Sequence, residues 1–425
     1  MTPPDSNEKK AGGVFYGWWI VAASIIGLST SPGQFVFGSL GIFTLPLSEE
    51  FGWNRAEISL ALTFFTISLA ITLPVIGRLV DNYGSRRILL PSMLFVSLGL
   101  VLIPLVLTQL WQLYLIFVLI GILGAGANNI TYLRTISAWF DKNRGLAMGI
   151  AVSGSGLGYA YMPVLVQYMI EISGWRAGYF VLAIIITLIA LPLVYFMLRE
   201  TPQELGLHPD GHTHSTLSNK ASVESGLHRS QVLRKREFWL LFFIFCVVSF
   251  SLFGLMIHFV PLLTDRGMSR IDAAFAASTI GFTIMGARIL IGYLIDRIFA
   301  PTVAFICFLL SAIGLALLAT GVSGFSAFIV AMLVGASIGA EADLLAFLTS
   351  RYFGLKCFGE VYGLLFASLL IGTSLGPFVY GLSFEMSGSY IWILVFCSIL
   401  CAIAAVVMKL LPHYPDFEVV DSKSD

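Results

Sequence analysis

Long apolar runs alternate with short polar stretches along almost the whole chain, and each run has the length of a membrane-crossing helix. The first six runs are Phe15–Leu47, Ala56–Leu79, Ile88–Leu107, Leu110–Ala138, Ala147–Ile170 and Ala177–Leu198. After a polar break, the other six are Phe238–Leu263, Ala273–Ile295, Thr302–Thr320, Phe325–Ser350, Val361–Phe384 and Ile391–Leu411. A helix satisfies its own backbone hydrogen bonds within a bilayer. The pattern therefore predicts an all-α membrane protein with twelve transmembrane helices.

The polar stretches divide the chain into two six-helix units. We expect a tail at residues 1–14, a first bundle at 15–198, a linker at 199–237, a second bundle at 238–411 and a tail at 412–425. The bundles repeat each other, because Pro46 matches Pro261 and the same offset pairs Gly52 with Gly267 and Arg55 with Arg270. A repeated six-helix unit predicts a pseudo-symmetric transporter with its site between the halves.

Composition agrees with a membrane protein. Hydrophobic residues make up 57% of the chain and charged residues 11%, and soluble domains carry about twice that share of charge. The formal net charge of +0 gives no reason to expect nucleic-acid binding. No nucleophile–base set, cofactor motif or metal-ligand spacing stands out, so we expect neither an enzyme nor a metal or cofactor site.

The distribution of lysine and arginine predicts the orientation. With the N-terminus inside, both tails, the linker and the inner connections hold most of these residues, and the outer connections hold only Arg55, Arg176, Arg266 and Arg270. Excess positive charge marks the cytoplasmic side. We expect both termini in the cytoplasm and a location in the plasma membrane, which is the inner membrane in a bacterium.

Arg288 is the main candidate for substrate binding. It lies inside an apolar run, eight residues before Asp296, and an intramembrane arginine persists when it is paired or faces an aqueous cavity. We interpret it as the anchor of an anionic substrate, with a structural ion pair as the alternative.

Two acids interrupt the tenth run, at Glu341 and Asp343. Their depths overlap that of Arg288, but they point about 200° apart on a helix, so one at most is expected to meet it. We interpret them as candidates for proton coupling, with a purely structural role as the alternative. His258 in the seventh run is a further candidate, because histidine titrates in the physiological range; hydrogen bonding between helices is its alternative.

Polar residues of other runs are candidates for the remaining wall of the site. Asn128 and Tyr132 are four residues apart, which places them on one helical face, and Asn129 is adjacent. Hydrogen bonding between helices is the alternative for each. Gln34 follows the Pro32–Gly33 break in the first run, and Tyr362 is a weaker candidate. Arg134 lies nearer the inner end, as a gate or helix-end charge.

Several motifs resemble known transporter signatures. GRLVDNYGSRR at Gly77–Arg87 is similar to the loop motif of the major facilitator superfamily, with a degenerate copy, GYLIDR, at Gly292–Arg297. YGWWIVAA at Tyr16–Ala23 and WFDKNRGLAMGIAVSGSGLG at Trp139–Gly158 resemble signatures of its monocarboxylate porter family. The first resemblance implies a gating role for the loop residues Asp81, Arg86, Arg87 and Asp296.

The porter resemblance also bears on the site. It implies that Arg288 contacts the substrate carboxylate. The chain departs from the family where vertebrate members carry a proton-site aspartate one turn before this arginine, since Ile284 stands there.

The sequence therefore predicts a proton-coupled transporter of small organic anions, most favourably monocarboxylates, that works by alternating access. Its expected partners are a small carboxylate, protons and the lipid bilayer, and it is expected to function as a monomer. One alternative is an anion exchanger, and another is a transporter-like sensor that binds its ligand without net flux.

Overall fold

The computed structural model describes residues 15–140, 144–209, 227, 229–295, 297–354 and 358–415, where the regular elements are helices. The first half contains α1 (Gly17–Ser29), α2 (Pro32–Phe51), α3 (Arg55–Tyr83), α4 (Ser85–Val106), α5 (Leu110–Leu123), η1 (Ala125–Ala127), α6 (Asn129–Trp139), α7 (Arg144–Ser173), α8 (Trp175–Ile184), η2 (Ile185–Ala190) and α9 (Leu191–Met197). Two short helices follow, η3 (Pro202–Leu205) and α10 (Arg229–Val232). The second half contains α11 (Arg236–Asp265), α12 (Arg270–Ile295), α13 (Ala300–Ala319), α14 (Phe325–Phe353), α15 (Phe358–Ser387) and α16 (Ile391–Lys409).

These helices confirm the predicted all-α fold of twelve spans. Among the described residues, 11 stretches are long and apolar enough to cross a membrane. The remaining predicted span consists of α5, η1 and α6, which are separate elements within one apolar run. The chain is therefore a multi-pass membrane protein.

Two spans of the first half are interrupted where polar candidates lie. Ser31 is extended because Pro32 follows it, and this separates α1 from α2 three residues before Gln34. In the fourth span, Asn128 is extended, with φ −115° and ψ 172°, and α6 begins after it. Interrupted membrane helices place backbone polar groups beside a cavity or binding site.

The sequence repeat has a direct structural counterpart. The matched glycines Gly52 and Gly267 both have left-handed backbones, with φ of 71° and 84°, which only glycine adopts readily. The matched residues Arg55 and Arg270 then begin α3 and α12. The two halves therefore turn at equivalent points before equivalent helices.

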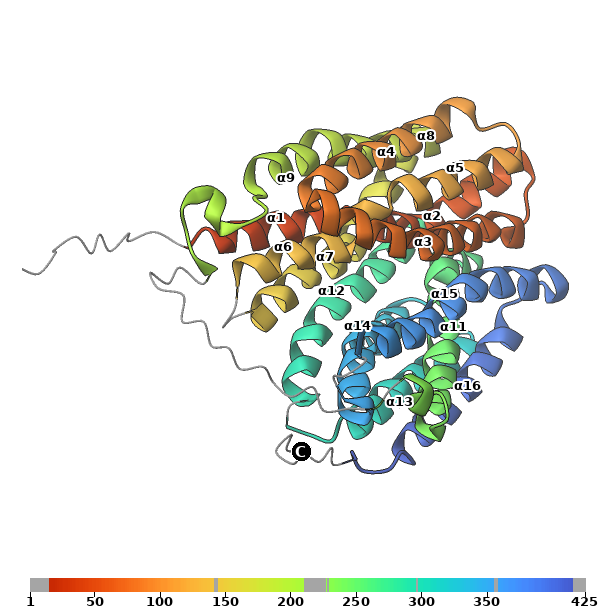
Figure 1. Cartoon of the computed structure of the whole chain (residues 1–425). Coiled ribbons are helices and arrows are strands. Elements are labelled where there is room, and N and C mark those ends of the chain that lie inside the picture. The colour runs from red at the N-terminus through yellow and green to blue at the C-terminus, as the bar shows by residue number, and fades with distance from the viewer. Residues whose placement is uncertain are drawn as a thin grey trace, which may run out of the picture.

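The two halves meet along three helix pairs, α7 with α12, α2 with α11, and α3 with α15. Small residues permit these close approaches: a Cβ added to Gly156 of α7 would lie 2.9 Å from the Met285 nitrogen of α12, and one added to Gly41 would collide with the Ile257 carbonyl. Figure 1 shows the halves together near the connections α2–α3 and α11–α12, and diverging toward the ends where α1 begins and α16 finishes. We call these two ends the far side and the termini side.

Candidate functional site

Arg288 lies within α12 and has an incomplete set of partners. Its Nη1 is 3.6 Å from Oδ1 of Asp343 in α14, which is longer than the roughly 2.7–2.9 Å of a charge-assisted hydrogen bond. The Arg288 Nε is buried and has no hydrogen-bond partner. The Arg288 side chain is 16% exposed and that of Asp343 is 36% exposed. The guanidinium therefore keeps unused donors beside one weakly held carboxylate.

Three more polar side chains complete what we call the Arg288 cluster. Tyr362 of α15 interacts electrostatically with both Arg288 and Asp343. From the other half, Tyr159 of α7 interacts with Arg288, and its hydroxyl also interacts with Gln34 of α2. The cluster thus joins both halves, and it includes Gln34 and Tyr362 from the sequence prediction.

Sequence reasoning missed Tyr159, although it directly follows the glycine-rich segment ending at Gly158. That segment is the available signal, because small residues allow α7 to approach α12 closely and bring Tyr159 near Arg288.

The structure places the three candidates of the fourth span elsewhere. Asn128 caps α6, where its side chain accepts a hydrogen bond of 2.7 Å from the Asn129 backbone. Because Asn128 is extended, the helical spacing that would put it on one face with Tyr132 does not apply. Tyr132 is fully buried within the first half, with its ring against Gly27 and its hydroxyl 3.7 Å from the Met93 sulfur. Asn129 is half-buried.

The second acid of α14 has a different environment. Glu341 is 2% exposed and accepts a hydrogen bond from the Ser249 hydroxyl of α11. Asp343 thus faces Arg288, while Glu341 is enclosed within the second half. An incoming anion would therefore compete with Asp343, and not with Glu341, for Arg288.

On the far side, a hydrogen-bonded network crosses between the halves. Arg55 of α3 forms two contacts with Asp265 at the end of α11, of 2.5 and 2.8 Å, and donates to the Tyr390 hydroxyl at 2.9 Å. The Tyr390 hydroxyl is also 3.0 Å from Nδ1 of His258, whose Nε2 lies 2.8 Å from the Pro377 carbonyl. Burial raises the pKa of Tyr390, so its hydroxyl stays protonated and able to donate to His258.

The network assigns the form of His258. Its Nε2 must carry the proton, because it faces a carbonyl acceptor, and Nδ1 then accepts from Tyr390. His258 is fully buried and thereby joined to Arg55 through one hydroxyl. It belongs to the far-side contact between the halves and not to the Arg288 cluster.

A second ion pair links the halves on the same side, with its arginine in the second half and its acid in the first. Arg270 of α12 pairs with Glu49 of α2, and Arg270 is the repeat-related counterpart of Arg55. Each half thus contributes one equivalent arginine to an acid of the other half. The two ion pairs link the halves on the far side; their arginines are related by the repeat, but their acids are not, since Asp265 matches Glu50 and not Glu49.

The gating candidates lie at the termini side, and the structure describes only some of them. Arg86 donates 2.7 Å to the Tyr195 carbonyl within the first half, and Arg87 is exposed. Arg134 is also exposed and has an interaction partner. The side chain of Asp81 and the whole of Asp296 are outside the described residues.

In the described part of the chain, no three His, Cys, Asp or Glu side chains gather as metal ligands would. The hydrogen-bond donors of the Arg288 cluster suit recognition of an anion. A guanidinium presents paired donors to a carboxylate, and the tyrosine hydroxyls and the Gln34 amide add neutral hydrogen bonds.

Known proteins resemble this chain over nearly its whole length. The family model described as Major Facilitator Superfamily matches residues 20–367. The uncharacterized MFS-type transporter YcxA of Bacillus subtilis is 24% identical over 392 residues, covering 90% of this chain and 91% of that protein. Monocarboxylate transporter 12 of Xenopus laevis is 24% identical over 435 residues, covering 96% and 91%.

A solved structure shares the fold. It is a bacterial homologue of the human lysosomal transporter Spinster in an inward-facing and occupied conformation. Its TM-score is 0.69 at 18% identity, covering 94% of this chain and 97% of that one.

Proposed function

This chain belongs to the Major Facilitator Superfamily, and we propose that it carries small monocarboxylates across the membrane together with protons. It is a membrane transporter and not an enzyme. The substrate class is supported by similarity to monocarboxylate transporter 12. The single observation that carries the proposal is the set of unused hydrogen-bond donors on Arg288. Its Nε is buried without a partner and its Nη1 lies 3.6 Å from Asp343.

Substrate binding and proton uptake are linked through the shared arginine. In the empty protein, Asp343 partly neutralises Arg288 at 3.6 Å. A substrate carboxylate with two oxygens matches the guanidinium better and displaces Asp343. The displaced carboxylate then lacks its cationic partner within the membrane span, and this favours uptake of a proton. One substrate and one proton thus load together, and the charge on Arg288 stays compensated.

Alternating access follows from the contact between the halves. With the termini in the cytoplasm, the far side is the external side, and the ion pairs Arg55–Asp265 and Arg270–Glu49 close it. Their rupture opens the Arg288 cluster to the outside. Candidate gates on the internal side are Asp81, Arg86, Arg87, Arg134 and Asp296. The transporter acts as a monomer in the plasma membrane.

The test is uptake of labelled pyruvate and lactate by the full-length protein in liposomes. We expect accumulation when the outside is acidic, and its loss when a protonophore collapses the gradient. Liposomes preloaded with unlabelled carboxylate measure exchange separately. Exchange without any gradient-driven accumulation would contradict proton coupling and favour the anion exchanger, and specific binding with neither kind of flux would favour the sensor.

The far-side ion pair predicts a shift between states when it is broken. We expect Asp265→Asn to increase far-side access to the interface about tenfold. Loss of the Arg55–Asp265 ion pair removes about 1.4 kcal/mol of stabilisation from the state closed on the far side, and this changes the ratio of open to closed protein tenfold. The measurement is the rate at which a membrane-impermeant maleimide labels a cysteine placed at Thr63, whose hydroxyl now bonds the Ser374 carbonyl across the halves at 2.6 Å.

Asp272→Asn is the matched control, because within the described residues Asp272 forms its hydrogen bonds locally, with Ser269 at the start of α12. Equal labelling rates in Asp265→Asn and in the Asp272→Asn control would show that the Arg55 pair does not hold the far side closed.

A further inference from the structure

The stretches that follow the last helix of each half form matching contacts at the termini side. Trp139, at the end of α6, donates from its indole Nε1 to the Arg199 carbonyl at 2.9 Å, just beyond α9. Tyr352, near the end of α14, donates from its hydroxyl to the Pro412 carbonyl at 2.6 Å, just beyond α16. One offset of 213 residues relates Trp139 to Tyr352 and Arg199 to Pro412. The repeat therefore relates the two bonds, although their donors differ in chemistry.

Each of these stretches also bonds the start of a neighbouring helix. Glu200 accepts a hydrogen bond of 3.0 Å from the Arg86 amide in the first turn of α4. The Tyr414 hydroxyl accepts one of 3.1 Å from the Ala300 amide, where α13 begins. The residues before these two helices, a glycine and a phenylalanine, have no side-chain acceptor. The first amides of a helix have no partner within it, so these stretches supply one from outside.

We call Leu198–Glu200 and Leu411–Tyr414 the two clasps. Leu198 and Leu411 are buried and anchor them, and each clasp ties together the third, fourth and sixth spans of its half at the termini side. The helix starts that they hold belong to gating segments. The start of α4 lies in the loop motif Gly77–Arg87, and the start of α13 follows the degenerate copy at Gly292–Arg297.

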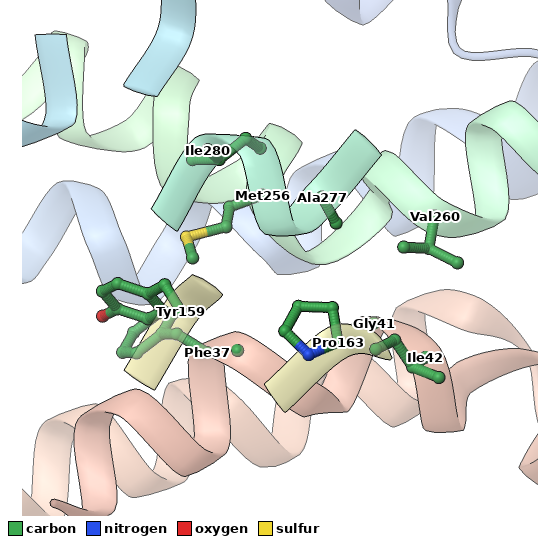
Figure 2. Close-up of a pocket in the computed structure, with 10 residues that line it drawn as sticks. Phe37, Gly41, Ile42, Tyr159, Pro163, Met256, Val260, Ala277 and Ile280 are labelled. Carbon is green, nitrogen blue, oxygen red and sulfur yellow. The ribbon is translucent and has the colours of Figure 1, made fainter. Parts of the chain in front are cut away.

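The clasps are formed in a structure whose halves are closed on one side only. On the far side, the rings of Phe37 in α2 and Phe253 in α11 have centroids 5.2 Å apart. Figure 2 shows further apolar side chains of both halves facing one another there, including Tyr159 of α7 and Ile280 of α12. Toward the termini side the halves diverge (Figure 1). Intact clasps thus accompany a closed far side and an open termini side.

Closing the termini side requires the ends that now diverge to approach each other, and each clasp bonds a gating segment back onto its own half. We propose that the clasps hold the termini side open, and that they are released when that side closes and the far side opens. The two states then differ in the clasp bonds, so weakening a clasp shifts their populations. This inference rests on the proposed alternating access but not on the identity of the substrate.

Removing single clasp bonds tests this inference. Tyr352→Phe and Tyr414→Phe each delete one hydroxyl and keep the ring, and the two rings are in contact with centroids 5.3 Å apart. We expect each variant to raise the labelling rate of a cysteine at Thr63 about two- to tenfold, the change in a population ratio for one lost hydrogen bond. The probe is a membrane-impermeant maleimide, applied without substrate to the full-length protein in liposomes.

Glu200→Ala tests the first clasp independently and should raise labelling as well. Tyr16→Phe is the matched control, because the Tyr16 hydroxyl donates to the Met197 carbonyl at 3.0 Å and joins the first span to the sixth on the same side. It should lower the unfolding temperature, as the clasp variants do, without changing the labelling rate.

Asp265→Asn, measured in the same assay, separates two kinds of failure. If Asp265→Asn raises labelling and the clasp variants do not, the clasps only stabilise the fold, and the inference is overturned. Slower labelling in the clasp variants would also overturn it, because the clasps would then favour the opposite state. Unchanged labelling in every variant, Asp265→Asn included, would count against the proposed alternating access as well.

Discussion

Substitution of Arg288 by lysine is expected to weaken monocarboxylate binding by about 10- to 100-fold while the protein still folds. A lysine keeps the positive charge but lacks the planar fork that gives a carboxylate two parallel hydrogen bonds. Losing one hydrogen bond to a charged group costs about 1.5–3 kcal/mol, which corresponds to this range. The measurement is competition for labelled pyruvate in counterflow, with folding checked by size-exclusion chromatography and thermal unfolding.

Arg351→Lys is the matched control on the adjacent helix α14. Arg351 lies over the rings of Phe347 and Tyr414, near the end of that helix and away from Asp343. We expect this variant to bind and transport as the wild type does. Unchanged affinity in Arg288→Lys would remove Arg288 from the substrate site, and with it the central argument for an organic anion.

The fold could be predicted because insertion into a membrane constrains the length and composition of each span. Each span needs about 20 apolar residues. Each of the twelve runs meets this requirement by itself, so it can be recognised without knowing its contacts with the others. The break at Pro32 was also visible, because a proline disfavours helix at the residue before it and the small Gly33 follows. The break at Asn128 was not, since Ala125–Ala127 forms a short helix that composition does not separate from its neighbours.

The site was predictable only at residues whose charge is energetically costly within a membrane. Arg288, Glu341 and Asp343 stand out because charge in a membrane must be compensated. Tyr159 did not, because a tyrosine in an apolar helix is ordinary and its partner Arg288 is in the other half. Which helices meet, and at what height, depends on close approaches such as that of Gly156 to Met285. Periodicity within one helix cannot supply that register.

Asparagine in place of Asp343 is expected to abolish accumulation driven by a pH gradient and to preserve counterflow exchange. The amide cannot carry a proton between the two sides, but the substrate carboxylate still finds Arg288 with its unused donors. Because the competing acid is absent, binding at neutral pH should become tighter, and it should lose the strengthening that acidification produces in the wild type. Arg288 is unpaired in the empty variant, so added substrate should raise its unfolding temperature more than that of the wild type.

Glu341→Gln separates this mechanism from a general effect of intramembrane acids. Glu341 is enclosed with Ser249 and lies away from Arg288, so its amide should keep gradient-driven accumulation if Asp343 alone exchanges with the substrate. Loss of coupling in Glu341→Gln with full coupling in Asp343→Asn would move the proton site to Glu341. Full accumulation in both variants would exclude the acids of α14 as carriers. His258 would then be the next proton site to test, because it joins the Arg55–Asp265 closure through Tyr390 and its protonation would add a second positive charge to that contact.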